Sequence, residues 1–165
     1  MPHISWMLKT TLRNAALATI PTFAAAFLGS LATQPQITGW YATVIKPSFN
    51  PPNWIFGPVW TLLFAMMAYA AFRILQRPAG TPGRSNALKL FFLQLVMNAS
   101  WSWAFFGSQS PLLGLLVIVP LLLMILGTIM LFRPLDRLAG ALLVPYALWV
   151  SFATLLNMSI WWLNR

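Results

Sequence analysis

The chain has almost no side chains suited to acid–base or metal chemistry. Its 165 residues include no cysteine, one histidine (His3) and one acidic residue (Asp136). Without cysteine there is no disulfide, thiolate nucleophile or thiolate metal ligand. A single carboxylate also excludes hydrolysis by paired carboxylates. We therefore expect no bound metal and no obligatory cofactor.

Charged residues are scarce as well, at 7% of the chain against 59% hydrophobic residues. Soluble domains carry about a quarter charged residues, so this chain cannot cover a water-facing surface. Its formal charge of +9 would suggest nucleic acid in a soluble protein. Here the basic residues lie between apolar runs, as in the cytoplasmic loops of membrane proteins. We expect a lipid bilayer as partner, and no nucleic acid.

Five apolar segments are long enough to cross a bilayer, which takes about 20 residues. The predicted fold class is an all-α membrane protein, a single domain with a bundle of five transmembrane helices. The predicted spans are 11–31, 54–75, 87–106, 112–132 and 138–163. The basic start of the chain also fits a cleaved signal peptide, but we interpret 11–31 as a retained helix.

The connection 32–53 is the longest between predicted spans and contains Pro35, Pro47, Pro51 and Pro52. Proline fixes a backbone dihedral angle and lacks an N–H donor, so we expect a stiff loop folded over one membrane face. The third and fourth connections are short, which predicts antiparallel neighbours in a compact bundle. We expect Asp136, in the fourth connection, to cap the N-terminus of the last helix.

The distribution of basic residues predicts the orientation of the chain in the membrane. Eight of them fall on one side of the predicted bundle: Lys9, Arg13, Arg73, Arg77, Arg84, Lys89, Arg133 and Arg137. Lys46 and Arg165 fall on the other side. Because cytoplasmic loops gather Lys and Arg, we expect a multi-pass protein with a cytoplasmic N-terminus and an external C-terminus.

Two predicted spans carry polar residues on one helical face. Gln94 and Asn98 are four residues apart and therefore share a face, which Trp101 continues. The last span has a second such face, formed by Tyr146, Trp149, Ala153 and Asn157. A buried amide needs a partner, and the sequence leaves two readings open: hydrogen bonds between helices or contact with a ligand.

Tryptophan is abundant, with nine residues, and phenylalanine has twelve. Trp6, Trp161 and Trp162 lie at helix ends, where they fit an aromatic belt at the membrane interface. The deeper tryptophans are Trp60, Trp101, Trp103 and Trp149. These are either lipid-facing or part of an aromatic-lined pocket for flat apolar ligands.

The stretch Gly39–Trp60, GWYATVIKPSFNPPNWIFGPVW, resembles the signature of the TspO/MBR family, the tryptophan-rich sensory proteins. The resemblance continues in QLVMNASW, which ends at Trp101, and in VPYALWVSFATLLN, Val144–Asn157. It implies a five-helix bundle, often a homodimer. It also implies a pocket beneath the first loop that binds porphyrins, including protoporphyrin IX and haem-related tetrapyrroles, and benzodiazepine-type drugs.

The resemblance also implies the pocket residues. The matching positions are Tyr41, Pro51, Trp60, Phe64, Asn98, Trp149 and Ala153, with Gln94 and Trp101 nearby and Tyr146 on the same face as Trp149. Some bacterial members are reported to degrade protoporphyrin in light. Tryptophans matching Trp60 and Trp149 are implicated, and these two would then be the catalytic residues.

Three functions fit this resemblance. We expect a receptor or sensor for porphyrins and other flat lipophilic molecules. The alternatives are a transporter of tetrapyrroles or lipids and a light-dependent porphyrin-degrading enzyme. The tyrosine of the sterol-recognition pattern in animal members is absent, since Met158 and Ser159 occupy that region. We therefore expect a bacterial member, located in the cell membrane.

Overall fold

Helices make up nearly all of the chain. The computed structural model describes residues 2–165, with side chains from Trp6 onward, so the His3 side chain lies outside the described part. Over these residues there is no β-strand. The elements are α1 (Pro2–Ile37), α2 (Trp40–Thr43), α3 (Asn53–Leu75), α4 (Arg84–Ser102), the π-helix η1 (Trp103–Gly107), α5 (Pro111–Leu135), α6 (Arg137–Leu142) and α7 (Val144–Leu163).

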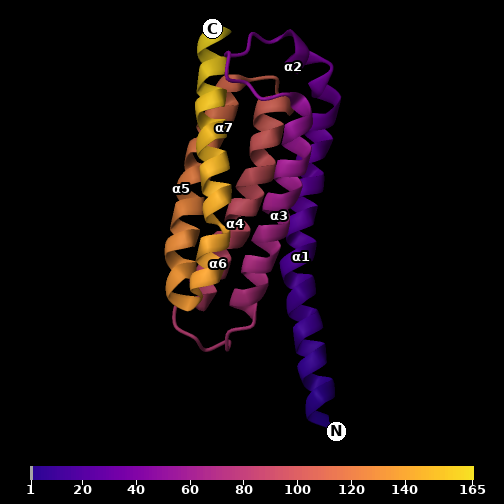
Figure 1. Cartoon of the computed structure of the whole chain (residues 1–165), viewed down its shortest axis with the longest axis vertical. Coiled ribbons are helices and arrows are strands. Elements are labelled where there is room, and N and C mark those ends of the chain that lie inside the picture. The colour runs from indigo at the N-terminus through magenta and orange to yellow at the C-terminus, as the bar shows by residue number, and fades with distance from the viewer. Residues whose placement is uncertain (1) are drawn as a thin grey trace.

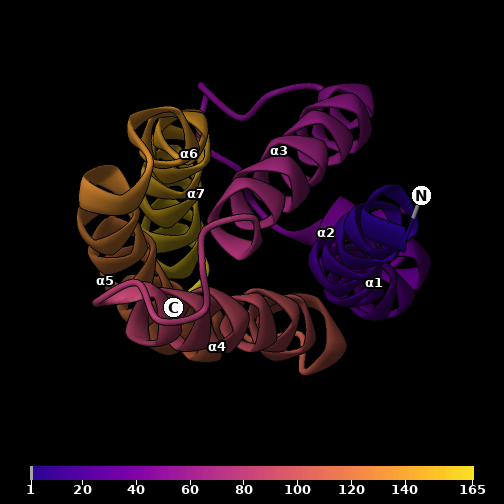
Figure 2. The same ribbon diagram turned by 90° about the horizontal axis from the view of Figure 1, so that it is seen from below.

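The long helices run side by side along a common axis (Figure 1). Helix α4 packs against α5 and α1, α5 packs against α7, and α3 packs against α1 and α6. Seen along the bundle, α1 stands at one edge with α3 and α4 as its neighbours (Figure 2). The predicted all-helical class is confirmed.

The number of apolar spans differs from the prediction. In the described chain, four helical segments are long and apolar enough to cross a membrane: Trp6–Ile37, Asn53–Leu75, Pro111–Leu135 and Arg137–Leu163. The predicted span 87–106 is helical, but α4 is not among the four. Polar side chains, including Lys89, Gln94 and Asn98, lower its apolar character.

The bounds of the predicted elements also differ in part from those of the structure. Helix α1 continues to Ile37, so the first residues of the predicted loop 32–53 belong to it, and α2 occupies part of the remainder. Pro35 lies in the last turn of this helix. The predicted span 138–163 is interrupted at Leu143, where Pro145, in the first turn of α7, cannot donate to the preceding turn.

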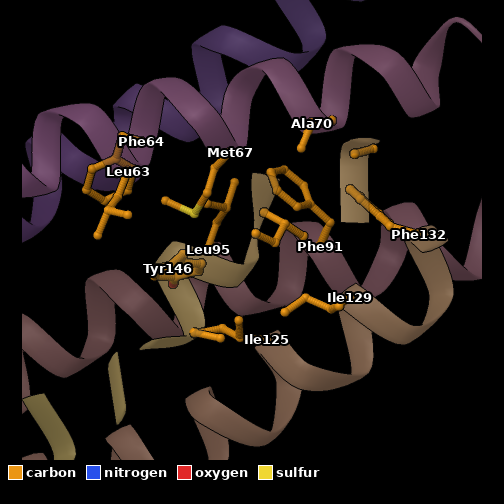
Figure 3. Close-up of a cluster of buried hydrophobic side chains, with 14 of the residues drawn as sticks. Leu63, Phe64, Met67, Ala70, Phe91, Leu95, Ile125, Ile129, Phe132 and Tyr146 are labelled. Atoms are coloured by element: carbon orange, nitrogen blue, oxygen red, sulfur yellow. The ribbon is translucent and has the colours of Figure 1, made fainter. Parts of the chain in front are cut away.

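The hydrophobic core fills the half of the bundle that holds the connection between α3 and α4 (Figure 1). Figure 3 shows side chains of α3, α4, α5 and α7 meeting there. The fully buried members include Met67 of α3, Phe91 of α4, Ile125 and Phe132 of α5 and Tyr146 of α7. Phe91 and Phe132 stack with ring centroids 5.8 Å apart. The opposite half of the bundle is less completely filled.

Asp136 caps α6, as predicted, because its carboxylate accepts from the backbone N–H of Ala139 over 2.9 Å. Its ionic partners are not its sequence neighbours: Arg73 at the end of α3 and Arg77 just after that helix lie 2.8 and 2.7 Å from the carboxylate. The hydrogen bonds from Arg73 hold the pKa of Asp136 well below its usual range, against the effect of burial. Asp136 thereby ties α6 to α3.

Candidate ligand-binding cavity

A cavity of 720 Å³ occupies the half of the bundle opposite the core. Residues of α1, α2, α3, α4, η1 and α7 line it. Its size falls within the range of small-molecule sites, about 300–1,000 Å³. Among the described residues, no charged side chain lines this cavity. It is therefore suited to a largely apolar molecule.

Aromatic rings form the wall made by α3 and α7. Trp60 and Phe64 are one helical turn apart on α3, with ring centroids separated by 5.6 Å. Trp149 of α7 meets Phe56 of α3 edge to face at 5.9 Å. The Trp149 indole N–H is buried and has no partner in the described part of the chain. Such a wall offers both area and stacking to a flat ligand.

A second aromatic group closes the cavity toward the loop. Phe105 and Phe106 of η1 are consecutive and both buried, and their ring centroids are 4.8 Å apart. Trp101 stacks on Phe105 at 5.6 Å, and Tyr41 of α2 meets Phe106 at 5.5 Å. The wider turn of a π-helix inserts an extra residue and often marks a functional site. Here it brings two adjacent phenylalanines to the same region.

The loop that carries Tyr41 is fastened at several points. The Tyr41 hydroxyl donates to Asn50 Oδ1 over 3.0 Å, and Lys46 Nζ lies 4.6 Å from the Tyr41 ring centroid. Burial raises the pKa of Tyr41. At the end of α7, Asn164 accepts from the Ile45 N–H over 3.0 Å and donates to the Ile45 carbonyl over 2.9 Å. The loop is thus held against the end of the bundle.

Most of the predicted site residues line the cavity. These are Tyr41, Trp60, Phe64, Asn98, Trp101, Trp149 and Ala153. The structure places three others differently. Pro51 is in the loop, where its carbonyl accepts from Asn50, and Gln94 and Tyr146 are buried behind Asn98. Whether any of these residues contacts a ligand remains a prediction.

The sequence analysis missed the wall contributed by α1. It includes small side chains at helical spacing, such as Ala25, Gly29 and Thr33. A Cβ atom added at Gly29 would lie 3.0 Å from Ser102 Oγ of α4, so the two helices approach closely there. The spacing of these small residues in the sequence indicates a face of this helix that packs closely against a neighbour.

The exposed residues of the lining all belong to α1 and α3. They include Phe23 and Phe27 of α1 and Trp54, Gly57 and Thr61 of α3. The residues contributed by α4, η1 and α7 are buried or half-buried. The cavity therefore opens sideways between α1 and α3. These helices are joined near the other end of the bundle, where Asn14 Nδ2 donates to the Leu75 carbonyl over 3.0 Å.

The predicted deep tryptophans do not all point inward. Trp60, Trp101 and Trp149 line the cavity, whereas Trp103 is half exposed and donates its indole N–H to the Leu28 carbonyl of α1 over 3.1 Å. Trp6 and Trp162, expected in an interfacial belt, are both exposed at helix ends. The abundance of tryptophan thus has three structural uses: cavity wall, helix contact and exposed helix end.

Comparison with known proteins agrees with the family resemblance. The model of the TspO/MBR family matches residues 17–163. The tryptophan-rich protein TspO of Chlorobaculum tepidum is 46% identical over 145 residues, covering 86% of this chain and 89% of the relative. The tryptophan-rich sensory protein of Cereibacter sphaeroides is 38% identical over 125 residues, covering 76% and 77%. The human translocator protein is 32% identical over 136 residues, covering 82% and 80%. From its motifs, its matched range and these relatives, the chain belongs to the TspO/MBR family.

Proposed function

We propose that the protein is a membrane receptor that binds porphyrins and other flat lipophilic molecules in the cavity. The observation that carries the proposal is the aromatic wall, in which Trp60, Phe64 and Trp149 line a 720 Å³ space without charged side chains. A porphyrin ring is flat and largely apolar, so it gains both area burial and stacking there. Its carboxylates would lie at the mouth, near the exposed amides of Gln34 and Asn53.

We further propose that α4 is a fifth membrane span. It lies between α1 and α5, and its polar residues Gln94 and Asn98 are buried against Tyr146 of α7. A helix in such a position needs less apolar character than one facing lipid. In this arrangement the N-terminus is cytoplasmic, the C-terminus is external, and the protein is a homodimer in a bacterial cell membrane. The mouth between α1 and α3 then faces the bilayer, from which a lipophilic ligand can enter.

Titration with protoporphyrin IX, followed by tryptophan fluorescence, tests the proposed binding. We expect saturable quenching, because Trp60 and Trp149 line the cavity. Ala153→Trp should abolish binding by filling the cavity, since Ala153 is part of its wall. Ala141→Trp, at an exposed position of α6, is the matched control and should bind normally. Absence of saturable binding by the wild-type protein would contradict the proposal.

A light-dependent degrading activity is the second candidate, favoured by one observation. Trp60 and Trp149, two oxidisable indoles, both line the cavity. Illumination of the protoporphyrin complex, followed by absorption spectroscopy, distinguishes the two functions. An unchanged absorption spectrum would support a receptor without degrading activity. Bleaching of the pigment that requires the folded protein would support the enzyme. Directional uptake of the pigment into vesicles would instead support a transporter.

A further inference from the structure

Behind the cavity wall, three polar side chains form a chain of hydrogen bonds that ends in an unpaired donor. Asn98 Nδ2 donates to the Tyr146 hydroxyl over 2.8 Å, and this hydroxyl donates to Gln94 Oε1 over 2.8 Å. The three residues are 5%, 1% and 1% exposed, respectively. Gln94 Nε2 is buried and has no partner among the described residues. Leaving a buried N–H unpaired is costly.

Only one member of this chain, Asn98, lines the cavity. One N–H of its Nδ2 atom is donated to Tyr146, and its Oδ1 atom is then the part of the amide that can accept a hydrogen bond from a ligand. A neighbouring polar pair is already occupied: Trp101 Nε1 donates to Asn157 Oδ1, and Asn157 Nδ2 donates to the Pro111 carbonyl. The wall thus offers a ligand the Asn98 amide, as well as the buried Trp149 indole N–H, which has no partner in the described part of the chain.

The same three side chains can also form these hydrogen bonds with donor and acceptor exchanged. An amide presents a donor and an acceptor of nearly equal size, and a tyrosine hydroxyl can donate or accept. If Gln94 Nε2 donates to Tyr146, the hydroxyl donates to Asn98 Oδ1 and Asn98 Nδ2 faces the cavity. Both directions keep two hydrogen bonds. The reverse direction pairs the orphaned Nε2 and leaves Gln94 Oε1 unpaired, and an unpaired carbonyl is less rare than an unpaired N–H. Each direction therefore leaves one polar atom of Gln94 unpaired, and the hydrogen-bond count excludes neither.

We propose that Gln94, Tyr146 and Asn98 form a reversible hydrogen-bond relay. In one direction Asn98 accepts a hydrogen bond from a ligand, and in the other it donates one. This inference rests on the proposed binding function and specifies its ligand class: flat apolar molecules with a neutral polar group that either donates or accepts. Gln94 and Tyr146 are positioning residues, since they act through Asn98.

Two matched probes test the relay: 1-hydroxypyrene, whose hydroxyl can donate as well as accept, and 1-methoxypyrene, which can only accept. We expect the wild-type protein to bind both. In Gln94→Met, the Tyr146 proton has only Asn98 Oδ1 to bond, so Asn98 Nδ2 is directed into the cavity. The affinity for hydroxypyrene relative to methoxypyrene should then fall by about threefold to tenfold, the effect of one hydrogen bond.

Tyr146→Phe shows whether the effect passes through the hydroxyl. Without that hydroxyl the Asn98 amide turns freely, so adding Gln94→Met should no longer change the ratio of affinities. Leu95→Met, at a buried neighbour of Gln94 on α4, is the control and should leave the ratio unchanged. An unchanged ratio in Gln94→Met, or a shift that persists in Tyr146→Phe, overturns the relay.

A measurement on the wild-type protein does not depend on the folding of any variant. Infrared difference spectra of the two pyrene complexes, with ¹³C-labelled glutamine, report on the side-chain carbonyl of Gln94. In the 1-hydroxypyrene complex this carbonyl should accept a hydrogen bond from the Tyr146 hydroxyl, and in the 1-methoxypyrene complex it should have no partner. Identical spectra overturn the relay. Protoporphyrin titration of the same samples separates the two proposals: failure to bind it contradicts the proposed function, whereas binding it without binding both pyrenes contradicts only the relay.

Discussion

Single side chains decide what the cavity can do, and the two tryptophans of its wall are the main example. Trp60 and Trp149 both line it, and phenylalanine keeps much of the area of an indole but lacks its N–H and is harder to oxidise. In Trp60→Phe and Trp149→Phe we expect porphyrin affinity to fall by about tenfold or less, since aromatic contacts contribute about 0.5–1.5 kcal/mol beyond burial. Any light-driven degradation should fall much further. Fluorescence titration and absorption spectroscopy on the same samples measure both.

Trp103→Phe is the control for these variants, because Trp103 is half exposed and lies outside the cavity lining. It should change neither binding nor degradation. Equal, modest losses of both properties in the cavity variants would mean that the indoles act only as walls. Full retention of both would place the ligand elsewhere in the protein.

Asp136 determines a second property at this scale, the dependence of stability on pH. Asp136→Asn keeps a capping oxygen for α6 but loses the ion pairs to Arg73 and Arg77. We expect a loss of about 1–2 kcal/mol, because the two arginine side chains are partly exposed, at 31% and 44%, and the solvent screens them. Thermal unfolding in detergent measures the difference. Arg137→Gln, at an exposed position, is the control and should have little effect.

The sign of this pH dependence follows from the direction of the pKa shift. The pKa of Asp136 is lower in the folded protein than its usual value, which is about 3.9 in an unfolded chain. The stabilisation is therefore fully present above about pH 4 and is lost as the pH falls from there through the folded-state pKa. The stability gap between wild type and Asp136→Asn should stay constant from pH 7 to about pH 4. A gap that closes between pH 7 and pH 5 would contradict this assignment.

At the scale of helices, hydropathy predicted where elements lie but not how each one ends. The positions of α3 and α5 follow from continuous apolar runs, and the structure confirms them within a few residues. The partners of the polar face of α4 depend on contacts with neighbouring helices. The break at Leu143 depends on Pro145. The π-turn of η1 has no local sequence signal of comparable strength. Consequently Trp60, Phe64 and Trp149 were predicted from motifs, whereas the cavity wall contributed by α1 required the fold.

The loop between α1 and α3 was predicted to be stiff because of its prolines, but its attachment depends on a residue far away in sequence. Asn164 makes two hydrogen bonds to the backbone of Ile45. We expect Asn164→Ala to release the loop and raise amide hydrogen exchange in residues 38–52, with faster exchange of bound porphyrin, because a local opening now breaks fewer contacts. Hydrogen-exchange mass spectrometry and stopped-flow fluorescence measure these effects. Asn86→Ala, at an exposed position near the start of α4, is the control and should change neither rate. Unchanged amide hydrogen exchange in Asn164→Ala would show that this contact does not hold the loop.

The whole molecule has two electrically different ends. The end that holds the connection between α3 and α4 also carries the start of α1 and of α6 (Figure 1). The eight basic residues predicted to share one side lie on these segments or on the adjoining ends of α3, α4 and α5, and Asp136 neutralises part of their charge. The other end has Lys46 in the loop and Arg165 at the C-terminus. This separation is the charge asymmetry that sets topology in multi-pass proteins.

The absence of cysteine makes this topology directly measurable, because any introduced cysteine is the only thiol in the chain. Ser48 is exposed in the loop between α1 and α3, and Gly80 is exposed in the connection between α3 and α4, at the opposite end of the bundle. We expect a membrane-impermeant maleimide to label Ser48→Cys in intact spheroplasts. Gly80→Cys should react only after lysis, since we propose that the basic end is cytoplasmic. Both positions are exposed, so a failure to react reports the membrane barrier and not burial within the protein. Labelling of Gly80→Cys but not Ser48→Cys in spheroplasts would reverse the assignment, and partial labelling of both would mean that the chain inserts in two orientations despite its charge asymmetry.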